Sequence, residues 1–411
     1  MRVIHISLAW IVTRLWVLLS GFEVIFYLSS VKLVSYPVLS KLFSDVDLYE
    51  YWAANLTYSY FVLLDQDPKW QYPPLAAVVF LLGYLIAANM VGFVFLALIA
   101  DLLIFIMLTR RAKQESNALP ALIWVVAPLV MGPIILGRFD VFPTLLAVFA
   151  LLHISSPKRF GVAVAIGALL KVWPILLLLA TPRGRFTQVA TWFVATFGIG
   201  ILLLGLWWNG NLFSFLGNQS SRGLQIESVG ALPFQIWQAG PGSVASAIQF
   251  GAHEIVASET GMVSLVLTLI GIALIGVLMF WRVTGRLDNS EPADIALTVV
   301  LISIMTSRVF SPQYMVWVFG LLAVAAFRPQ KNFRRILILI SISSGLGQLI
   351  YPFLYGSFIA GGWIPVVVHT VRIVTLTWAT VIMWSNLQRN VSLHPKSPTM
   401  KNEPTIVSKH L

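Results

Sequence analysis

The sequence contains no cysteine and few charged residues. Without cysteine, the chain forms no disulfide, carries no thiolate nucleophile and offers no sulfur ligand to a metal. Charged residues make up 10% of its 411 residues and hydrophobic residues 58%, whereas an ordinary soluble protein has about 25% charged residues. So few charges do not cover a surface exposed to water. The composition therefore predicts an integral membrane protein.

Nucleotide-binding and zinc-binding motifs are also missing. The sequence has no Gly-x-x-x-x-Gly-Lys-Ser/Thr phosphate loop, no Gly-x-Gly-x-x-Gly after a strand and no His-Glu-x-x-His pair. Without a soluble nucleotide-binding domain, a nucleotide-sugar donor is disfavoured. The net charge of +11 would favour nucleic acid as a partner of a soluble protein, but membrane orientation itself requires basic residues in short loops. We therefore expect no nucleic-acid binding.

Apolar runs of membrane-spanning length recur along the whole chain. A transmembrane helix needs about 20 apolar residues. Ten spans are predicted, near 7–30, 91–109, 119–136, 141–154, 187–208, 261–281, 295–309, 312–327, 336–354 and 366–386. The first run has no small-residue cleavage site and contains Arg14, so we expect a retained helix rather than a cleaved signal peptide.

Two further apolar runs, 73–88 and 161–180, are placed by the cytoplasmic preference of Lys and Arg. If neither run crosses the membrane, the basic clusters of the chain all share the cytoplasmic side. These clusters lie at residues 110–113, 158–159, 183–185, 282–286 and 328–335 and in the C-terminal tail. Both runs are therefore predicted to be surface-lying or re-entrant helices.

The predicted fold is all-α, a multi-pass protein of the plasma membrane with about ten spans. Residues 1–386 are expected to form a single transmembrane catalytic domain, and residues 387–411, rich in polar residues and poor in apolar ones, a disordered cytoplasmic tail. Two long loops, about 31–72 and 209–260, fall on the outer face. A catalytic site is expected there, facing the periplasm or the exterior.

The first outer loop carries a cluster of carboxylates, Asp45, Asp47 and Glu50. On a helix, Asp45, Tyr49 and Trp52 would share a face, because residues three and four apart are neighbours. The acids could simply cap a solvated surface helix, or Asp45 could act in catalysis. An Asp-x-Asp pair is also compatible with a hard cation, although such sites usually need more ligands.

Cations and amides recur farther along, at one face of the membrane. They occur in Gly137-Arg138-Phe139-Asp140, Lys171-Val172-Trp173-Pro174, Arg222 to Ser228, and Ser307-Arg308-Val309-Phe310-Ser311-Pro312-Gln313-Tyr314. A charge at mid-membrane costs roughly 2.5–3.5 kcal/mol, so Lys171 is expected in a protein-lined cavity with an anionic partner. Arg14, Asp101 and Arg372 lie within predicted spans, and we expect them to neutralise one another in the bundle.

The ordered succession of these motifs resembles a known enzyme family. The series is Asp45-Val46-Asp47-Leu48-Tyr49 with Trp52, Trp70-Gln71-Tyr72-Pro73-Pro74, Gly137-Arg138-Phe139-Asp140, Lys171-Val172-Trp173-Pro174, Arg222 to Ser228 and Ser311-Pro312-Gln313-Tyr314. It resembles the polyprenol-phosphate-mannose-dependent mannosyltransferases of the GT-C superfamily, in particular the actinobacterial phosphatidylinositol-mannoside mannosyltransferase family, which also contains a membrane arabinofuranosyltransferase. The likeness runs from about residue 7 to 327. It implies juxtamembrane helices in the outer loops and a catalytic Asp in the first of them. Asp45 matches that position by its spacing to Tyr49, while Asp47 leaves the assignment open.

The resemblance and the residues together predict a lipid-linked sugar transferase. A carboxylate, Asp45 with Asp47 as the second candidate, would act as general base, and Lys171, Arg308 and Arg222 would bind the donor phosphate as charge develops on it. Direct displacement would invert the anomeric centre. The residues expected to bind the sugar or the acceptor are Glu227, Gln313, Tyr314, Tyr49, Trp52, Tyr72, Arg138 and Asp140. No metal is required, although the Asp-x-Asp pair leaves a divalent cation open.

The expected partners are a polyprenyl-phosphate sugar, a glycolipid or glycan acceptor and the bilayer. Mannose is favoured over arabinofuranose only by its frequency in the family. A transporter or flippase for a lipid-linked sugar is the competing class, since it too needs charge within the membrane. Transporters tend to show inverted repeats with paired broken helices, whereas this chain has one candidate broken segment and no halving, so a transferase is favoured.

Overall fold

The computed structural model describes residues 3–22, 43–57, 64, 67, 69–208 and 211–392. The end of the first predicted span and the start of the first predicted outer loop, residues 23–42, lie outside the described residues, as do residues 393–411 of the predicted tail. Helix predominates in the described residues, and six helical stretches are long and apolar enough to cross a membrane. The predicted all-α, polytopic membrane fold is confirmed.

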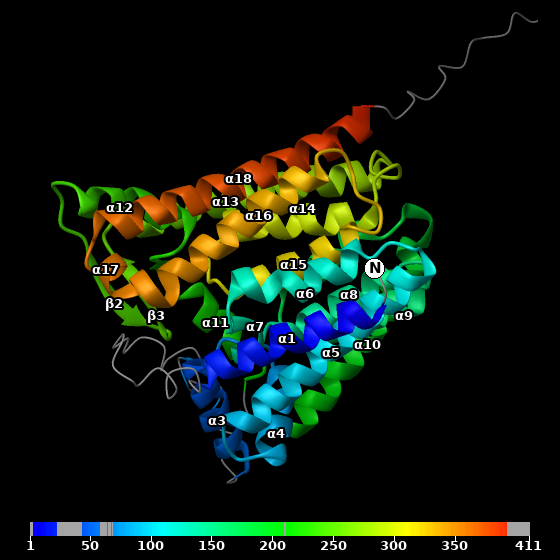
Figure 1. Ribbon diagram of the computed structural model, residues 1–411, viewed down its shortest axis with the longest axis horizontal. Coiled ribbons are helices and arrows are strands. Elements are labelled where there is room, and N and C mark those ends of the chain that lie inside the picture. Colours follow the sequence, from blue (N-terminus) through cyan, green and yellow to red (C-terminus); the bar gives the residue numbers. More distant parts are fainter. Residues whose placement is uncertain are drawn as a thin grey trace, which may run out of the picture.

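Within the residues that the structure describes, each predicted span contains helix (Figure 1), although the helices in 119–136, 141–154, 295–309 and 312–327 are shorter than the six candidate spans. The helices are α1 (Val3–Gly21), α5 (Met90–Gln114), α6 (Leu119–Met131) with the short α7 (Ile134–Gly137), α8 (Val141–Leu152), α10 (Phe186–Trp207), α13 (Thr260–Val283), α14 (Pro292–Met305), α15 (Tyr314–Ala325), α16 (Phe333–Gln348) and α18 (Trp363–Ser392). Helix α18 thus continues to Ser392, beyond residue 387, where the tail was predicted to begin.

The burial of the helices divides them into an inner and an outer group. Helices α14 and α15 are apolar on every side and almost entirely buried, as expected for helices that pack on all faces. The candidate spans Arg183–Trp207 and Thr260–Val283 are only 11% and 17% buried. Their exposed apolar faces are suited to lipid.

The two extra apolar runs form helices of a different kind. Residues 73–88 contain α4 (Leu75–Ile86). Residues 161–180 cover all but the first turn of α9 (Pro157–Leu170) and a 3-10 helix, η3 (Trp173–Ala180). The chain is extended at Lys171 between them, and Pro174 lacks the N–H that a continuous α-helix would use. The run is therefore broken at its only cation. The surface-lying or re-entrant placement of the two runs stays a prediction.

The second predicted outer loop contains a small antiparallel sheet that the sequence analysis did not predict. Its strands are β1 (Leu224–Gln225), β2 (Ala245–Gln249) and β3 (Ala252–Val256), in the order β1-β3-β2. Phe250 and Gly251, with φ of 49° and 78°, make the tight turn between β2 and β3, the backbone geometry that two-residue hairpins favour. The remaining short elements are α3 (Ser44–Thr57), η4 (Arg183–Arg185), α11 (Ser214–Ser220), η5 (Val229–Ala231), α12 (Leu232–Ala239), the π-helical η6 (Leu349–Leu354) and α17 (Tyr355–Ile359).

Arg14 and Asp101 form a buried ion pair that ties α1 to α5. Nη2 of Arg14 lies 2.7 Å from Oδ1 of Asp101, and its Nε lies 2.9 Å from Oδ2. Arg14 also donates 3.2 Å to the carbonyl of Trp124 in α6. Pro128, one turn later, lacks the N–H that would bond this carbonyl. The predicted neutralisation of Arg14 by Asp101 is confirmed.

The helices place basic loops and outer-loop elements at opposite ends. Figure 1 shows the N-terminus and the C-terminal end of α18 at one end, and α12, α17 and the β2–β3 hairpin at the other. Arg111, Ser155, Glu291 and Arg328 border one small cavity, so the loops after α5, α8 and α15 meet at the first end. Two of the predicted cytoplasmic clusters, at residues 110–113 and 328–335, therefore lie together at this end, away from the sheet.

Candidate active site

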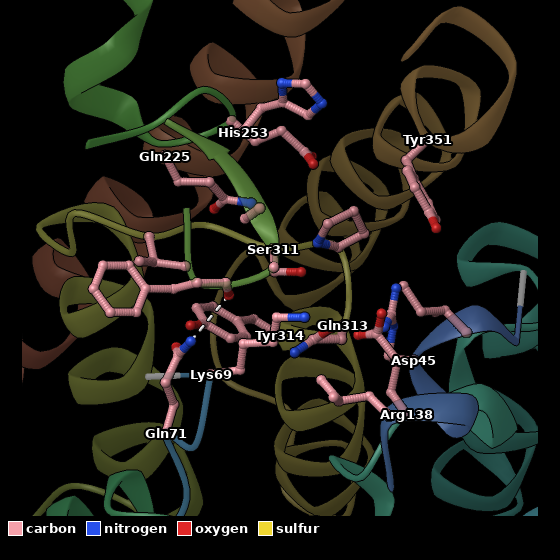
Figure 2. Close-up of a pocket in the computed structure, with 18 of the residues that line it drawn as sticks. Asp45, Lys69, Gln71, Arg138, Gln225, His253, Ser311, Gln313, Tyr314 and Tyr351 are labelled. Atoms are coloured by element: carbon pink, nitrogen blue, oxygen red, sulfur yellow. Dashed lines mark hydrogen bonds and ion pairs between the residues drawn. The ribbon is translucent and has the colours of Figure 1, made fainter. Parts of the chain in front are cut away.

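A cavity of about 520 Å³ lies at the end of the helices that carries the sheet. Segments far apart in sequence surround it: α3, residues 69–72, the end of α7, the break after α9, the second outer loop, residues 309–314 and the region from η6 to α17. Figure 2 shows polar side chains from these segments pointing toward one another, with Asp45 and Arg138 on one side of the view and Gln71 and Lys69 on the other. Both predicted outer loops thus contribute to one cavity.

Most of the predicted site residues line this cavity. They are Asp45, Tyr49, Trp52, Tyr72, Arg138, Lys171, Arg222, Glu227, Gln313 and Tyr314. Three others do not: Asp47 is exposed on α3, Asp140 is buried behind Lys171, and Arg308 lies behind Arg222.

Asp45 forms an ion pair with Arg138 at the cavity wall. Asp45 stands in the first turn of α3, where the helix dipole favours an acid, and it remains partly exposed. Arg138, at the end of α7, is buried. Burial lowers the pKa of its guanidinium, while the neighbouring Tyr351 and Asp140 raise it. Arg138 therefore fixes the position of the Asp45 carboxylate, the group predicted to act as base.

Lys171 lies in an aromatic enclosure with a carboxylate behind it. Its Nζ donates a hydrogen bond of 2.7 Å to Oδ1 of Asp140, and Nε1 of Trp317 donates one of 2.5 Å to the same oxygen. The ammonium also lies 5.0–5.5 Å from the ring centres of Tyr72, Tyr314 and Trp317, within the range of cation–π attraction. Burial lowers the pKa of Lys171, and the charge of Asp140 opposes this. Asp140 is thus the anionic partner that Lys171 was expected to have.

Arg222 is held by contacts on both sides. Its Nη1 donates 2.6 Å to Oε1 of Gln71, and its Nε lies 3.4 Å from Oε1 of Glu254. Arg308, predicted to bind the donor phosphate, instead donates through Nη1 to the carbonyls of Ser220 and Arg222, each at 2.9 Å. The structure therefore places Arg308 as a support for the Arg222 backbone.

A cluster of aromatic side chains holds α3 against the cavity. Tyr49 stacks on Phe80 with 4.4 Å between ring centres, and its hydroxyl lies 3.2 Å from that of Tyr72. Trp52 donates from Nε1 to Asp67 at 2.8 Å. Burial raises the pKa of both Tyr49 and Tyr72, so both phenols stay neutral. The cluster fixes the helix from which Asp45 projects.

The model of glycosyltransferase family 87 matches residues 70–312, more than half of the chain. The chain belongs to glycosyltransferase family 87. No curated protein and no solved structure matches. The prediction of a membrane glycosyltransferase is confirmed by this match. The matched region contains Arg138, Lys171 and Arg222, whereas Asp45 and Tyr314 lie outside it.

In this family 87 glycosyltransferase, Arg372 does not join Arg14 and Asp101, so the prediction that the three neutralise one another was wrong for Arg372. Arg372, on α18, lies with its Nη1 2.5 Å from Oε2 of Glu227 in the second outer loop, and not against Arg14 or Asp101. Both side chains are buried, and Glu227 lines the cavity. Burial raises the pKa of Glu227, and the charge of Arg372 lowers it. Arg372, a charge within a predicted span, thus pairs with Glu227, a residue that lines the cavity.

Several cavity residues were given no role by the sequence analysis, although Gln71, Gln225 and Ser311 stand in its motifs. They are Lys69, Gln71, Gln219, Gln225, His253, Ser311, Tyr351 and Tyr355. Tyr351 had a signal, because Pro352 follows it within a predicted span, and a proline there indicates a break in the helix. Gln71 stands in one of the motifs of the sequence analysis but was given no role there, and His253 has no signal that distinguishes it from other loop residues. Their placement depends on the hairpin turn, where Gln71 donates 3.0 Å to the carbonyl of Phe250.

Proposed function

We propose that this glycosyltransferase moves mannose from a polyprenyl-phosphate donor to a glycolipid or glycan acceptor at the non-cytoplasmic face of the plasma membrane. One observation carries the proposal: Asp45, Lys171 and Arg222 surround a single cavity at the end of the helices opposite the basic loops. Cytoplasmic loops carry an excess of Lys and Arg. The cavity end is therefore the one assigned to the outside.

The cations of the cavity suit a phosphate leaving group. As the bond between the anomeric carbon and the phosphate oxygen breaks, its electron pair moves to that oxygen. Fixed donors in a cavity shielded from water stabilise such developing charge far more than water does. Lys171 and Arg222 are the proposed phosphate contacts, because both line the cavity and both are held by neighbours. In this scheme Arg308 acts through Arg222.

Asp45 is the proposed general base. The acceptor hydroxyl attacks the anomeric carbon from the face opposite the phosphate, a new carbon–oxygen bond forms, and the hydroxyl proton passes to the Asp45 carboxylate. This displacement inverts the anomeric centre. Asp45 lines the cavity and Asp47 is exposed outside it, which favours Asp45. The scheme uses only side chains of this chain, and the described residues contain no group of three His, Asp or Glu placed to hold a metal.

The remaining cavity residues are proposed to bind hydroxyls of the sugar and the acceptor. Glu227 reaches the cavity from the second predicted outer loop, and Gln313 and Tyr314 reach it from the segment before and at the start of α15. Tyr49, Trp52 and Tyr72 form a rigid aromatic wall beside Asp45. Mannose is proposed over arabinofuranose as the transferred sugar because it is the more frequent one in the family that the motif series resembles.

The test uses purified protein reconstituted with a lipid extract as acceptor. We expect polyprenyl-phosphate-mannose to increase the mass of a membrane glycolipid by one hexose, and a nucleotide-linked mannose to have no effect. Transfer only from polyprenyl-phosphate-arabinofuranose would overturn the choice of sugar. A change in the leaflet of the donor lipid without any new product would indicate a flippase, and transfer from the nucleotide sugar would overturn the lipid donor.

A further inference from the structure

We infer that Arg372 is a positioning residue, which holds the Glu227 carboxylate in place at the cavity so that it binds a substrate hydroxyl. The inference rests on the proposed function, because it assigns a role within the same cavity. Glu227 lines that cavity, whereas Arg372 lies behind it on α18. Arg372 therefore acts on substrate only through Glu227.

The packing around Arg372 fixes its guanidinium in one place. The group lies 4.1 Å from the ring centre of Phe310. On α16, Gly347 allows a close approach, because a Cβ atom there would stand 3.1 Å from Nε of Arg372. The guanidinium is thus confined by α16 and by residue 310 while its Nη1 meets Glu227 at 2.5 Å.

A comparison with the other buried arginine pair separates a structural role from a functional one. Arg14 bonds through Nε, Nη1 and Nη2, to Asp101 and to the backbone of α6. Arg372 bonds through Nη1, but its buried Nε and Nη2 have no hydrogen-bond partner. Buried donors without partners cost free energy. An arginine that served only to hold helices together would have its donors satisfied, as Arg14 does, whereas Arg372 meets a carboxylate at the cavity.

Several charged and titratable groups face the Glu227–Arg372 pair. Burial raises the pKa of Glu227, and the charges of Arg372 and Arg138 lower it. Tyr355 approaches Glu227 from α17, and His369 lies beside Arg372 on α18. Loss of the Arg372 charge would raise the pKa of Glu227, so a larger fraction of the carboxyl would be protonated at a given pH. Activity that needs the carboxylate would then recover only as the pH rises.

The test compares Arg372→Gln, Arg372→Lys and Glu227→Gln, with Arg14→Gln as the matched control for loss of a buried arginine pair. Transfer is measured from pH 5 to 9 and normalised to folded protein. We expect Arg372→Gln to lower kcat/KM roughly tenfold or more at neutral pH and to move the acid limb of the profile to higher pH. Arg372→Lys should restore much of this loss, because it keeps the charge. Arg14→Gln should lower the amount of folded protein without moving the limb.

The double variant Arg372→Gln/Glu227→Gln gives a readout that does not depend on the pH profile. It should be no less active than Glu227→Gln alone, because both changes disable the same carboxylate. Additive losses, or an acid limb that stays in place in Arg372→Gln, would overturn the inference while wild-type transfer leaves the proposed function standing. Absence of transfer by the wild type would overturn the proposed function, and the inference with it.

Discussion

Nζ of Lys171 lies 2.7 Å from Oδ1 of Asp140, and three aromatic rings surround the ammonium. The break between α9 and η3 places Lys171 at the cavity, and the carboxylate behind it offsets part of the cost of burying the charge. A cation held in this way needs no rearrangement to meet a phosphate. The proposed phosphate contact of Lys171 therefore depends on Asp140 and on the three rings that hold its ammonium in place.

Replacement of Lys171 by Met should weaken donor binding. The change keeps an unbranched side chain inside the aromatic enclosure but removes the ammonium, so the KM for the polyprenyl-phosphate donor should rise roughly tenfold to a hundredfold. The KM for the acceptor should change little. Lys113→Met, at the basic end of the helices, is the control for removal of a lysine. An unchanged donor KM together with an unchanged kcat would remove Lys171 from the site.

Replacement of Asp140 by Asn should shift the pH dependence of donor binding. Burial lowers the pKa of Lys171 and the Asp140 charge raises it, so loss of that charge lowers the pKa of Lys171 further. The ammonium is then lost at lower pH. The alkaline limb of kcat/KM for the donor should move down by about one pH unit or more. Asp288→Asn removes the partner of Arg282 instead, and it should leave this limb in place.

Asp45 and Asp47 provide a matched pair of variants two residues apart. Asp45→Asn should lower kcat roughly a hundredfold or more, the usual contribution of a general base, with the KM values little changed. Asp47 is exposed and outside the cavity, so Asp47→Asn should retain transfer within a few-fold of the wild type. Transfer by Asp45→Asn at the wild-type rate, measured with the purified enzyme, would refute Asp45 as the base.

Much of the fold could be predicted because the membrane imposes a strong pattern on sequence. Apolar runs of sufficient length mark helices wherever the chain lies in lipid, and every predicted span contains helix. The three-stranded sheet was missed, because β1 has only two residues and its neighbour β3 lies about thirty positions away. Such short strands carry too little alternation of apolar and polar residues to be distinguished from loop.

The site was predictable where a residue violates the membrane pattern, and not where its partner is distant. Lys171 stood out as a charge in an apolar run, and the cavity does surround it. Arg372 stood out for the same reason, but its partner Glu227 is 145 positions away in an outer loop. A local pattern contains nothing that pairs two such residues. Arg308 was predicted to bind the donor phosphate because its position in a loop on the outer face could be inferred from the sequence. The direction of its side chain, toward the carbonyl of Ser220, could not be inferred.

The orientation of the cavity can be tested directly, because the chain has no cysteine and any introduced thiol is unique. Asp47 and Gln114 are both exposed, the first on α3, which also carries Asp45, and the second at the basic end of α5. We expect a membrane-impermeant maleimide to label Asp47→Cys in intact cells and Gln114→Cys only after the membrane is opened. Transfer activity of each variant checks that its fold is retained. The opposite labelling pattern would place the cavity in the cytoplasm and overturn the outer-face assignment, since the two positions lie at opposite ends of the helices.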